Sequence, residues 1–478
     1  MLIFIHGIDK MRVFSYNVVL LKIFSRRCGI VDTAVKNMAS ENLKVVKFGG
    51  SSLADAQQFR KVGEIIKSDT RRRYVVPSAP GKRFSGDDKV TDLLYSCYET
   101  AKKGENIDPV FARVTERYYA IVKELDVHCD LSAEFEYIRS ALIHHAGRDY
   151  IASRGEYLSA KILSAYLGFD FIDAGEVIFF NEKGEFDSER TNETLTECLA
   201  LHEYAVIPGF YGTMPNGTIK TFSRGGSDIS GSIVARAAKA DIYENWTDVS
   251  GFLMADPRII KDPEIIDTIT YRELRELSYM GATVLHEDSI FPVRFAGIPI
   301  NIRNTNRPED PGTMIVPTAD ESVSDRIITG IAGKKGFSVI TLEKDMMNSE
   351  LGFGRRMLQV LENEGISFEH LPSGIDTMSV IVNTNALEGK RDRILSNLCK
   401  ETEPETISIE DDLALIAVVG RRMISAKGTA ARVLNAISKA DINIRMIDQG
   451  SCELNIIVAV SAGDFEAALT AIYNEFIK

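Results

Sequence analysis

The sequence predicts an α/β protein in which a largely parallel sheet lies between helix layers, followed by two small α+β modules. Three observations predict it. From Leu43 onward, short apolar runs alternate with stretches of helical periodicity, and the last part of the chain repeats itself. The chain of 478 residues also exceeds what one hydrophobic core usually supports, so we expect several domains.

Composition excludes some classes of function. The chain is 45% apolar and 26% charged, with a formal net charge of -12. This acidic balance argues against a nucleic acid or an anionic membrane as the main partner. The six cysteines contain no CxxC pair, and the seven histidines show no ligand spacing with them. We therefore expect reduced thiols, a cytoplasmic location and no protein-bound structural metal.

Residues 1–42 differ from the rest. Up to Met38 they hold six Lys or Arg against only Asp9 and Asp32, and the apolar run that ends at Lys22 is too short to span a membrane. Two interpretations remain: an organellar transit segment, or a non-catalytic upstream extension with Met38 as the natural start. Composition favours the extension.

The first elements follow from the pattern after residue 42. Leu43–Phe48 is an apolar run that ends in a glycine turn, and apolar residues at helical spacing come next. This pattern predicts a strand, a turn and a helix. Further strands are predicted at Tyr74–Val76, Phe169–Ile172 and Tyr204–Ile207, with a helix over Tyr157–Tyr166.

The C-terminal part repeats without gaps at an offset of 76 residues, so that Gly352 falls on Gly428. Each copy predicts a strand, a glycine turn, an amphipathic helix and two strands. Two such modules favour ligand binding or dimerisation over catalysis. The polar stretch Pro317–Arg326 marks the boundary before them. The predicted domains are 43–318 for the catalytic part, then 327–402 and 403–478 for the modules, which could also interleave.

Lys47 interrupts the first apolar strand and is followed by Gly49, Gly50 and two serines. A lysine there costs desolvation unless it meets an anion, while the glycines let backbone N–H groups approach phosphate oxygens. The pattern indicates a phosphate cradle. The alternative is an edge-strand lysine beside an ordinary turn.

A second cluster, Ser223–Asp228, directly precedes a helical pattern. Arg224 could clamp a carboxylate, and Asp228 could position the substrate, a metal or the lysine. The alternative is a helix cap formed by Ser227 or Asp228. The sequence has no GxxxxGK[ST] loop, no HRD or DFG set and no GxGxxG fingerprint, which excludes P-loop enzymes, protein kinases and nicotinamide-binding enzymes.

Val46–Ser52 resembles the opening motif of aspartate kinases, within the amino acid kinase family. Further motifs follow in the family's order: Ser153–Glu156, Arg224–Asp228, Trp246–Gly251, Asp256–Arg258 and Gly281–His286. The resemblance runs from about Leu43 to the C-terminus, where the two modules resemble ACT domains. It implies a three-layer, carbamate kinase-like domain followed by two ferredoxin-like ACT domains.

The resemblance also implies an activity: phosphorylation of the L-aspartate side-chain carboxylate with ATP and Mg²⁺, the first step toward lysine, threonine and methionine. Lys47 would bridge to the transferring phosphoryl group, and Asp228 would hold the catalytic arrangement. The implied aspartate pocket is Ser78, Thr91, Glu156, Arg224 and Ser227, with Arg224 for the α-carboxylate and Glu156 for the α-ammonium. The implied nucleotide contacts are Lys47, Gly49, Gly50, Ser51, Thr247, Asp248 and Arg258.

These roles agree with the chemistry. Because the attacking carboxylate and the γ-phosphoryl group are both negative, the site must concentrate positive charge and align the atoms. An ionised carboxylate needs no strong general base, which fits the absence of histidine from the proposed site residues. Two departures from the family affect ATP binding: Thr283 stands where relatives often have lysine, and Leu253 where some have an aromatic residue.

For the modules, the resemblance implies feedback inhibition by lysine, with threonine as a second candidate, in a homodimer or dimer of dimers. The expected effector site in the first module is Met346, Ser349, Gly352, Phe353, Glu369 and Ser373. A glycine turn exposes N–H groups to a carboxylate, and Glu369 could take an ammonium. Alternatively, the modules only dimerise, or the whole chain is a catalytically silent amino-acid sensor.

Overall fold

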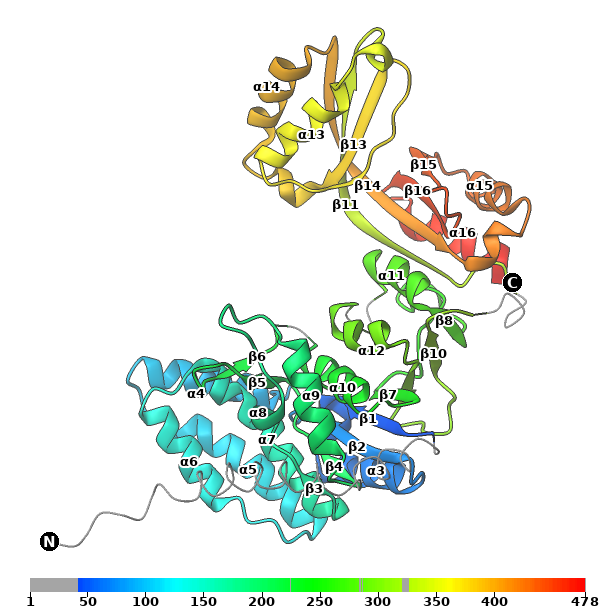
Figure 1. Cartoon of the computed structure of the whole chain (residues 1–478). Coiled ribbons are helices and arrows are strands. Elements are labelled where there is room, and N and C mark those ends of the chain that lie inside the picture. Colours follow the sequence, from blue (N-terminus) through cyan, green and yellow to red (C-terminus); the bar gives the residue numbers. More distant parts are fainter. Residues whose placement is uncertain (1–41, 224, 283–284, 286, 320–325, 478) are drawn as a thin grey trace, which may run out of the picture. The chain divides into compact units, whose positions relative to one another are not determined.

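The computed structural model describes residues 42–223, 225–282, 285, 287–319 and 326–477. Contacts divide the chain into a first unit that ends at Glu244 and a second that begins at Asn245 (Figure 1). Among the described residues, no helix combines the length and apolar character that a membrane crossing requires.

The first unit is built on parallel strands, in the order β3-β4-β2-β1. β7 follows β1 in the strand order, and its first three residues belong to the first unit. Side chains of β1 and β2 are almost all buried, as expected for a parallel sheet covered on both faces. The strands are β1 (Lys44–Phe48), β2 (Arg72–Pro77), β3 (Asp170–Phe171), β4 (Ala205–Val206) and β7 (Ile242–Thr247). A separate hairpin pairs β5 (Tyr211–Thr213) with β6 (Ile219–Thr221).

Two groups of helices pack on this sheet, α10 with α9, and α7 with α3, α4, α5 and α6. Their starts follow local signals; for example, the Asp55 side chain accepts from the N–H of Gln58 at the start of α3. The helices are α3 (Ala56–Lys67), α4 (Val90–Lys102), α5 (Asp108–Leu125), α6 (Ser132–Ile143), α7 (Arg148–Leu167), α8 (Ala174–Val177), α9 (Ser188–Leu199) and α10 (Gly226–Ala237). The expected α/β architecture is confirmed.

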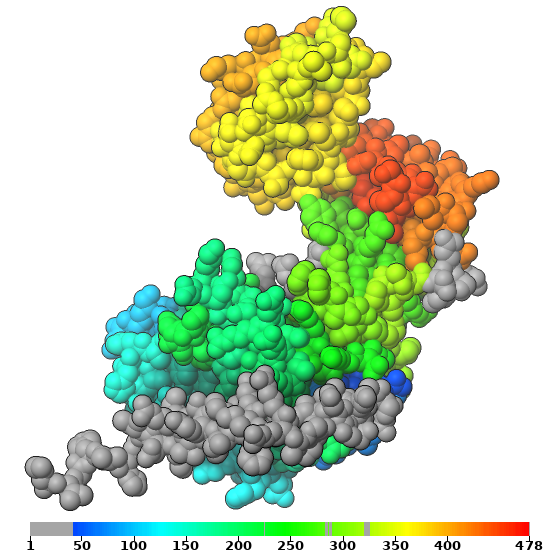
Figure 2. Space-filling model, in the orientation of Figure 1, coloured from blue at the N-terminus to red at the C-terminus, as the bar shows by residue number. Residues whose placement is uncertain are grey.

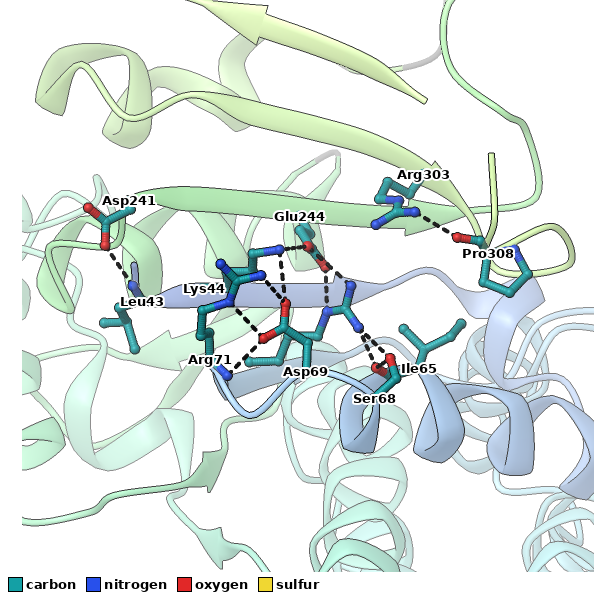
Figure 3. Close-up of polar contacts among 11 residues, drawn as sticks. Leu43, Lys44, Ile65, Ser68, Asp69, Arg71, Asp241, Glu244, Arg303 and Pro308 are labelled. Carbon is teal, nitrogen blue, oxygen red and sulfur yellow. Dashed lines mark hydrogen bonds and ion pairs between the residues drawn. The ribbon is translucent and has the colours of Figure 1, made fainter. Parts of the chain in front are cut away.

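A buried ion cluster joins the first residues of β1 and β2 to Glu244 on β7 (Figure 3). Glu244 on β7 accepts from Lys44 Nζ at 2.9 Å and from Arg72 Nε at 2.8 Å, and Lys44 also pairs with Asp69. Burial raises the pKa of Glu244, but hydrogen bonds and charge from Arg72 and Lys44 outweigh burial and leave that pKa lowered. Three strands are thus joined by one ionised carboxylate.

The second unit begins with a short mixed sheet and two helices. β10 pairs antiparallel with β9 and parallel with β8. A capping box starts α11, because Thr270 accepts from the N–H of Glu273 while the Glu273 side chain accepts from the N–H of Thr270. The elements are β8 (Thr268–Thr270), α11 (Tyr271–Tyr279), the 3-10 turn η3 (Glu287–Ile290), α12 (Phe291–Ala296), β9 (Ile300–Asn304) and β10 (Thr313–Val316).

The two sequence repeats share one antiparallel sheet, in the order β12-β13-β11-β14-β16-β15. The central strands β11 and β14 are each 14 residues long and pair along nearly their whole length. Figure 2 shows the first repeat, in yellow and light orange, and the second, in deeper orange to red, as two lobes of the surface. The elements are β11 (Gly330–Glu343), α13 (Phe353–Asn363), β12 (Phe368–His370), β13 (Thr377–Asn383), α14 (Arg391–Thr402), β14 (Thr406–Val419), α15 (Thr429–Lys439), β15 (Met446–Asp448), β16 (Asn455–Ser461) and α16 (Phe465–Ile477).

The repeat predicted from the sequence is visible in the backbone. Gly352 and Gly428, 76 positions apart, both stand directly before a helix with positive φ, at 81° and 86°. That conformation favours glycine, which explains why both copies retain it. The boundaries at 327–402 and 403–478 stay a prediction.

The side chain of Glu273 connects α11 to the repeats. It is fully buried and accepts hydrogen bonds from the Thr329 hydroxyl and from Arg421, through the N–H and the guanidinium. Burial raises the pKa of Glu273, but hydrogen bonds from the Thr329 hydroxyl, from the N–H and hydroxyl of Thr270 and from the Arg421 N–H together outweigh burial and leave the pKa lowered. An ionised carboxylate therefore lies between α11 and the ends of the two central strands.

The ion cluster of the first unit gives a stability prediction. Glu244→Gln should lower the free energy of unfolding by about 3 kcal/mol, because Arg72 and Lys44 would lose the buried carboxylate that joins them and Lys44 would keep only its pair with Asp69. The single tryptophan, Trp246, lies on the same strand and reports unfolding in urea by fluorescence. Since the pKa of Glu244 is lowered, the advantage of the wild type should be complete above about pH 4.3 and disappear as the pH falls further.

The matched control is Asp88→Asn, which breaks the exposed pair between Asp88 and Arg113. It should change stability by less than about 0.5 kcal/mol. Equal losses in the two variants would contradict a special role for the buried cluster.

Candidate active site

The loops that follow β1, β2 and β4 lie side by side at the carboxyl ends of these parallel strands. The N–H of Ser78 donates to the carbonyl of Phe48 at 3.0 Å, and the N–H of Gly209 donates to the carbonyl of Pro77 at 3.2 Å. In open α/β sheets this edge is where ligands bind. The glycine turn and Ser78 are therefore brought together at this edge.

The glycine turn is packed tightly against the loop after β2. The N–H of Gly81 donates to the carbonyl of Gly50 at 2.8 Å. A Cβ added at Gly50 would lie 2.9 Å from the carbonyl oxygen of Ala79, and one added at Gly81 would lie 2.7 Å from the carbonyl carbon of Gly50. Both positions thus require glycine because two backbones meet there.

Lys47 and Asp228 form an ion pair, with Nζ 2.6 Å from Oδ1. Lys47 is 7% exposed and stands one residue before the end of β1, while Asp228 lies in the first turn of α10. The residue before that helix, Gly225, has a φ of 57°, which glycine adopts at little cost. The pair joins the two glycine-rich segments that the sequence analysis singled out.

Glu156 lies on α7 and is buried, with Oε2 lacking any hydrogen-bond partner. Burial raises the pKa of this carboxyl to about 8, although the backbone of Ala79 and the charge of Arg154 act in the opposite direction. Without a ligand the group is therefore mostly protonated at neutral pH. A cation that reached it would restore the ionised form.

The remaining predicted pocket residues stand on the same loops and helices. Ser227 on α10 packs against Gly209, where an added Cβ would lie 2.7 Å from the Ser227 Cβ. Thr91 opens α4 next to Val90, whose N–H donates to the carbonyl of Pro80. Arg224 lies outside the described residues, so its predicted clamp is untested.

Sequence reasoning missed Arg117, which binds the loops on either side of the glycine contact through their backbone carbonyls. This buried side chain of α5 donates to the carbonyls of Ala54 and Gly81, both at 3.2 Å, and pairs with Asp87 at 2.6 Å. Burial lowers the pKa of Arg117. The available signal was an arginine within the apolar stripe that contains Phe111 and Tyr118 of that helix.

Of the predicted nucleotide residues of the second unit, Thr247 ends β7 and Asp248 follows it, whereas Arg258 lies in the loop beyond. The Thr247 hydroxyl donates to Asp248 at 3.2 Å, and Arg258 pairs with Asp256 at 2.6 Å. Hydrogen bonds from Arg258 lower the pKa of Asp256. Neither Thr247 nor Asp248 lines the nearby cavity described next.

That cavity measures about 290 Å³ and is lined by Arg258 and Leu253. Its wall also includes Ile331, Ala332 and Gly333 of β11, which sequence reasoning did not include. Gly333 is required there because an added Cβ would lie 2.6 Å from the carbonyl oxygen of Leu415. Thr283, the expected departure beside this region, lies outside the described residues.

Four of the predicted effector residues share the turn between β11 and α13. Met346 has a φ of 57° and is exposed, whereas Phe353 is buried in the core of the first repeat. Glu369 lies on β12 and accepts a hydrogen bond from the hydroxyl of Tyr279 on α11. The turn residues are Met346, Ser349, Gly352 and Phe353, and Ser373 bridges to Met378 on β13.

Known proteins match along most of the chain. Residues 42–304 match the amino acid kinase family, and residues 416–476 match the ACT domain. Aspartokinase 3 of Bacillus subtilis is 38% identical over 91% of this chain and 98% of its own length. The crystal structure of Clostridium acetobutylicum aspartate kinase is 51% identical, covers 91% of this chain and 100% of that one, and superposes with a TM-score of 0.83.

A more distant relative shows the fold alone. Escherichia coli aspartokinase III, in a structure with aspartate and ADP, is 24% identical, covers 91% of this chain and 100% of that one, and has a TM-score of 0.68. The family matches, the relatives over nearly full length and the motifs in their order agree with one another. The chain belongs to the aspartate kinases of the amino acid kinase family.

Proposed function

We propose that the first unit phosphorylates L-aspartate through Lys47 and Asp228, with Glu156 holding the acceptor, and that lysine regulates the enzyme through the repeats. The observation that carries the catalytic part is the buried pair between Lys47 and Asp228 beside the glycine turn. It supplies a positive charge next to the turn at which Gly50 and Gly81 bring two backbone segments together.

The reaction needs charge neutralisation more than proton transfer. The aspartate side chain attacks the γ-phosphoryl group as an ionised carboxylate, so no base has to remove a proton. Lys47 would turn from Asp228 toward the phosphoryl oxygens as negative charge builds up there. Asp228 would keep the Lys47 ammonium in place before and after the transfer, since Lys47 Nζ and Asp228 Oδ1 are 2.6 Å apart.

Mg²⁺ would enter with the nucleotide. Among the described residues, no group of three His, Cys, Asp or Glu side chains could hold a metal ion by itself. A magnesium ion commonly uses one or two carboxylates together with substrate phosphates and water, and Asp228 is the carboxylate available beside Lys47. The ion would neutralise phosphate charge in the transition state.

Glu156 would receive the α-ammonium of aspartate. Its unpartnered Oε2 and its raised pKa both indicate a carboxyl whose partner is a ligand rather than another part of the protein. Arg224 would take the α-carboxylate, and the hydroxyls of Ser78, Thr91 and Ser227 would orient the substrate. ATP would contact Gly49, Gly50 and Ser51 in the first unit, and Thr247, Asp248 and Arg258 in the second.

Regulation would begin at the turn before α13. The positive φ of Gly352 leaves backbone N–H groups at the start of the helix for a ligand carboxylate. Glu369 would take an ammonium group, and its present partner is Tyr279 on α11. An effector bound at Glu369 would therefore release α11 from the first repeat. Lysine is the favoured inhibitor because it offers both a carboxylate for the N–H groups and an ammonium group for Glu369. The enzyme would be a homodimer or a dimer of dimers. The cytoplasmic location stays a prediction.

The catalytic pair is tested first. Lys47→Ala should lower turnover by about 10²-fold or more, because the transition state loses its fixed positive charge, while the protein stays folded. Lys102→Ala, at an exposed position of α4, should leave turnover unchanged. A coupled ATP assay with aspartate, glutamate and acetylglutamate as acceptors measures both rate and substrate choice. Retained activity in Lys47→Ala would remove the proposed role.

The pKa of Glu156 gives a pH prediction. Its folded value of about 8 lies above the ordinary value, so the ligand-free protein should lose stability as pH rises from about 4.3 to 8. Glu156→Gln cannot ionise and should melt at a higher temperature than the wild type at about pH 9, with the difference disappearing at or below about pH 4. Aspartate should then stabilise the wild type more than the variant. Glu136→Gln, at an exposed site, should show neither effect.

The regulatory part is tested by titrating lysine and threonine in the same assay. Lysine at millimolar concentration should inhibit, and Glu369→Ala should remain active but lose inhibition, with a coupling of about 1–3 kcal/mol removed. Glu362→Ala, on an exposed part of α13, is the control. Tyr279→Phe should lower the lysine concentration needed, because the competing hydroxyl is gone. Insensitivity of the wild type to both amino acids would leave dimerisation as the role of the repeats.

A further inference from the structure

Arg154 on α7 is a buried cation outside the site described above. It is 6% exposed and stands two residues before Glu156. With 3.6 residues per turn, positions two apart point to nearly opposite sides of a helix. The Arg154 side chain therefore lies on another side of α7 than Glu156, although its charge still acts to lower the pKa of that carboxyl.

Three tyrosine rings surround the guanidinium. Its central carbon lies 4.6 Å from the ring centre of Tyr150, 4.5 Å from that of Tyr157 and 5.2 Å from that of Tyr211. Aromatic faces attract a cation but do not accept its N–H groups as carboxylate oxygens do. The rings therefore lower the cost of burying the Arg154 guanidinium, but they do not satisfy its N–H groups.

The hydrogen bonds of Arg154 are few. Nε and Nη2 donate to the hydroxyl of the neighbouring Ser153, at 3.1 and 2.9 Å. Among the described residues, no carboxylate lies within ion-pair distance of Arg154, and Nη1 has no hydrogen bond. A buried guanidinium is ordinarily paired with an anion, since its desolvation is costly. Within the described part of the chain, Arg154 thus lacks a protein anion, although none of its nitrogen atoms is both fully buried and without a hydrogen bond.

A cavity of about 240 Å³ meets Arg154 between α6 and α7, which pack together (Figure 1). Tyr137, Ile138 and Glu134 line it from α6, and Tyr150, Arg154 and Tyr157 line it from α7. Tyr137 is 68% exposed, so this cavity runs from an exposed aromatic ring to a buried cation. Its volume is below the 300–1,000 Å³ typical of sites for drug-sized ligands, so a small molecule matches the space beside Arg154.

The charges restrict the ligand further. Glu134 is already paired with Lys161, so Arg154 is the cation that an anion would meet in this cavity. The planar fork of a guanidinium matches a carboxylate, and one carboxylate satisfies it. A second negative charge would lie near Glu134 and be disfavoured. The tyrosine rings suit an aromatic or branched apolar body.

We propose that this tyrosine–arginine cavity binds a small monocarboxylate with an apolar body, the carboxylate on Arg154 and the body against the exposed ring of Tyr137, which itself packs edge to face on Tyr150. The site is separate from aspartate phosphorylation and does not depend on it. Occupancy would link α6 to α7, the helix that also carries Glu156.

Calorimetric titration of the full chain with benzoate and phenylacetate tests the site, in saturating aspartate so that the aspartate pocket is occupied. We expect dissociation constants at or below about 10 mM. Benzamide, which lacks the charge, should bind at least tenfold more weakly. Arg154→Met should weaken benzoate binding at least tenfold, whereas Arg148→Met, on the same helix with its guanidinium over Tyr95, should not.

Tyr137→Ala provides a second variant if Arg154→Met does not fold, because an exposed ring can be removed without opening the core. It should weaken benzoate binding at least threefold. The proposal is overturned if benzoate does not bind, if it binds these variants as well as the wild type, or if inorganic phosphate binds through Arg154 more tightly than benzoate does.

Discussion

A buried lysine on the first strand is the constraint on which the site depends. Lys47 is 7% exposed at the carboxyl end of β1, and its charge is tolerated because Asp228 lies 2.6 Å away. That requirement ties the start of α10 to β1, and with it the second glycine-rich segment to the first. Removing either partner would leave an uncompensated charge at the ligand-binding edge of the sheet.

Around this edge, glycines stand where loops approach each other too closely for a side chain. Gly50 and Gly81 meet so closely that neither tolerates a Cβ, and Gly209 leaves room for Ser227. Arg117 fixes the same loops from α5 through two carbonyl oxygens. Phosphoryl transfer requires little covalent chemistry from a protein, so accurate placement of backbone N–H groups and one cation constitutes most of the proposed catalytic machinery.

In the second unit, one long strand, β11, connects the cavity proposed near the nucleotide to the turn proposed to bind the effector. The first residues of β11 line the cavity that includes Arg258, and the other end of the strand leads into the turn before α13. Glu273 and Glu369 add polar contacts between α11 and the repeats. A change at the turn therefore has physical routes, through packed backbone and hydrogen bonds, to residues beside the cavity.

The sequence by itself determined the parallel α/β part, the two glycine turns and the repeated α+β module, because these follow from local periodicity and from backbone positions that only glycine adopts freely. It also singled out Lys47 and Asp228, with contact to the lysine as one of three roles open to Asp228. Only the tertiary structure decided that Glu156 is buried with a raised pKa, that Arg117 holds the glycine loops and that Arg154 lies among three tyrosines. Each of these properties depends on groups brought together from distant parts of the chain, and burial changes the energy of a charge in ways that no local pattern records.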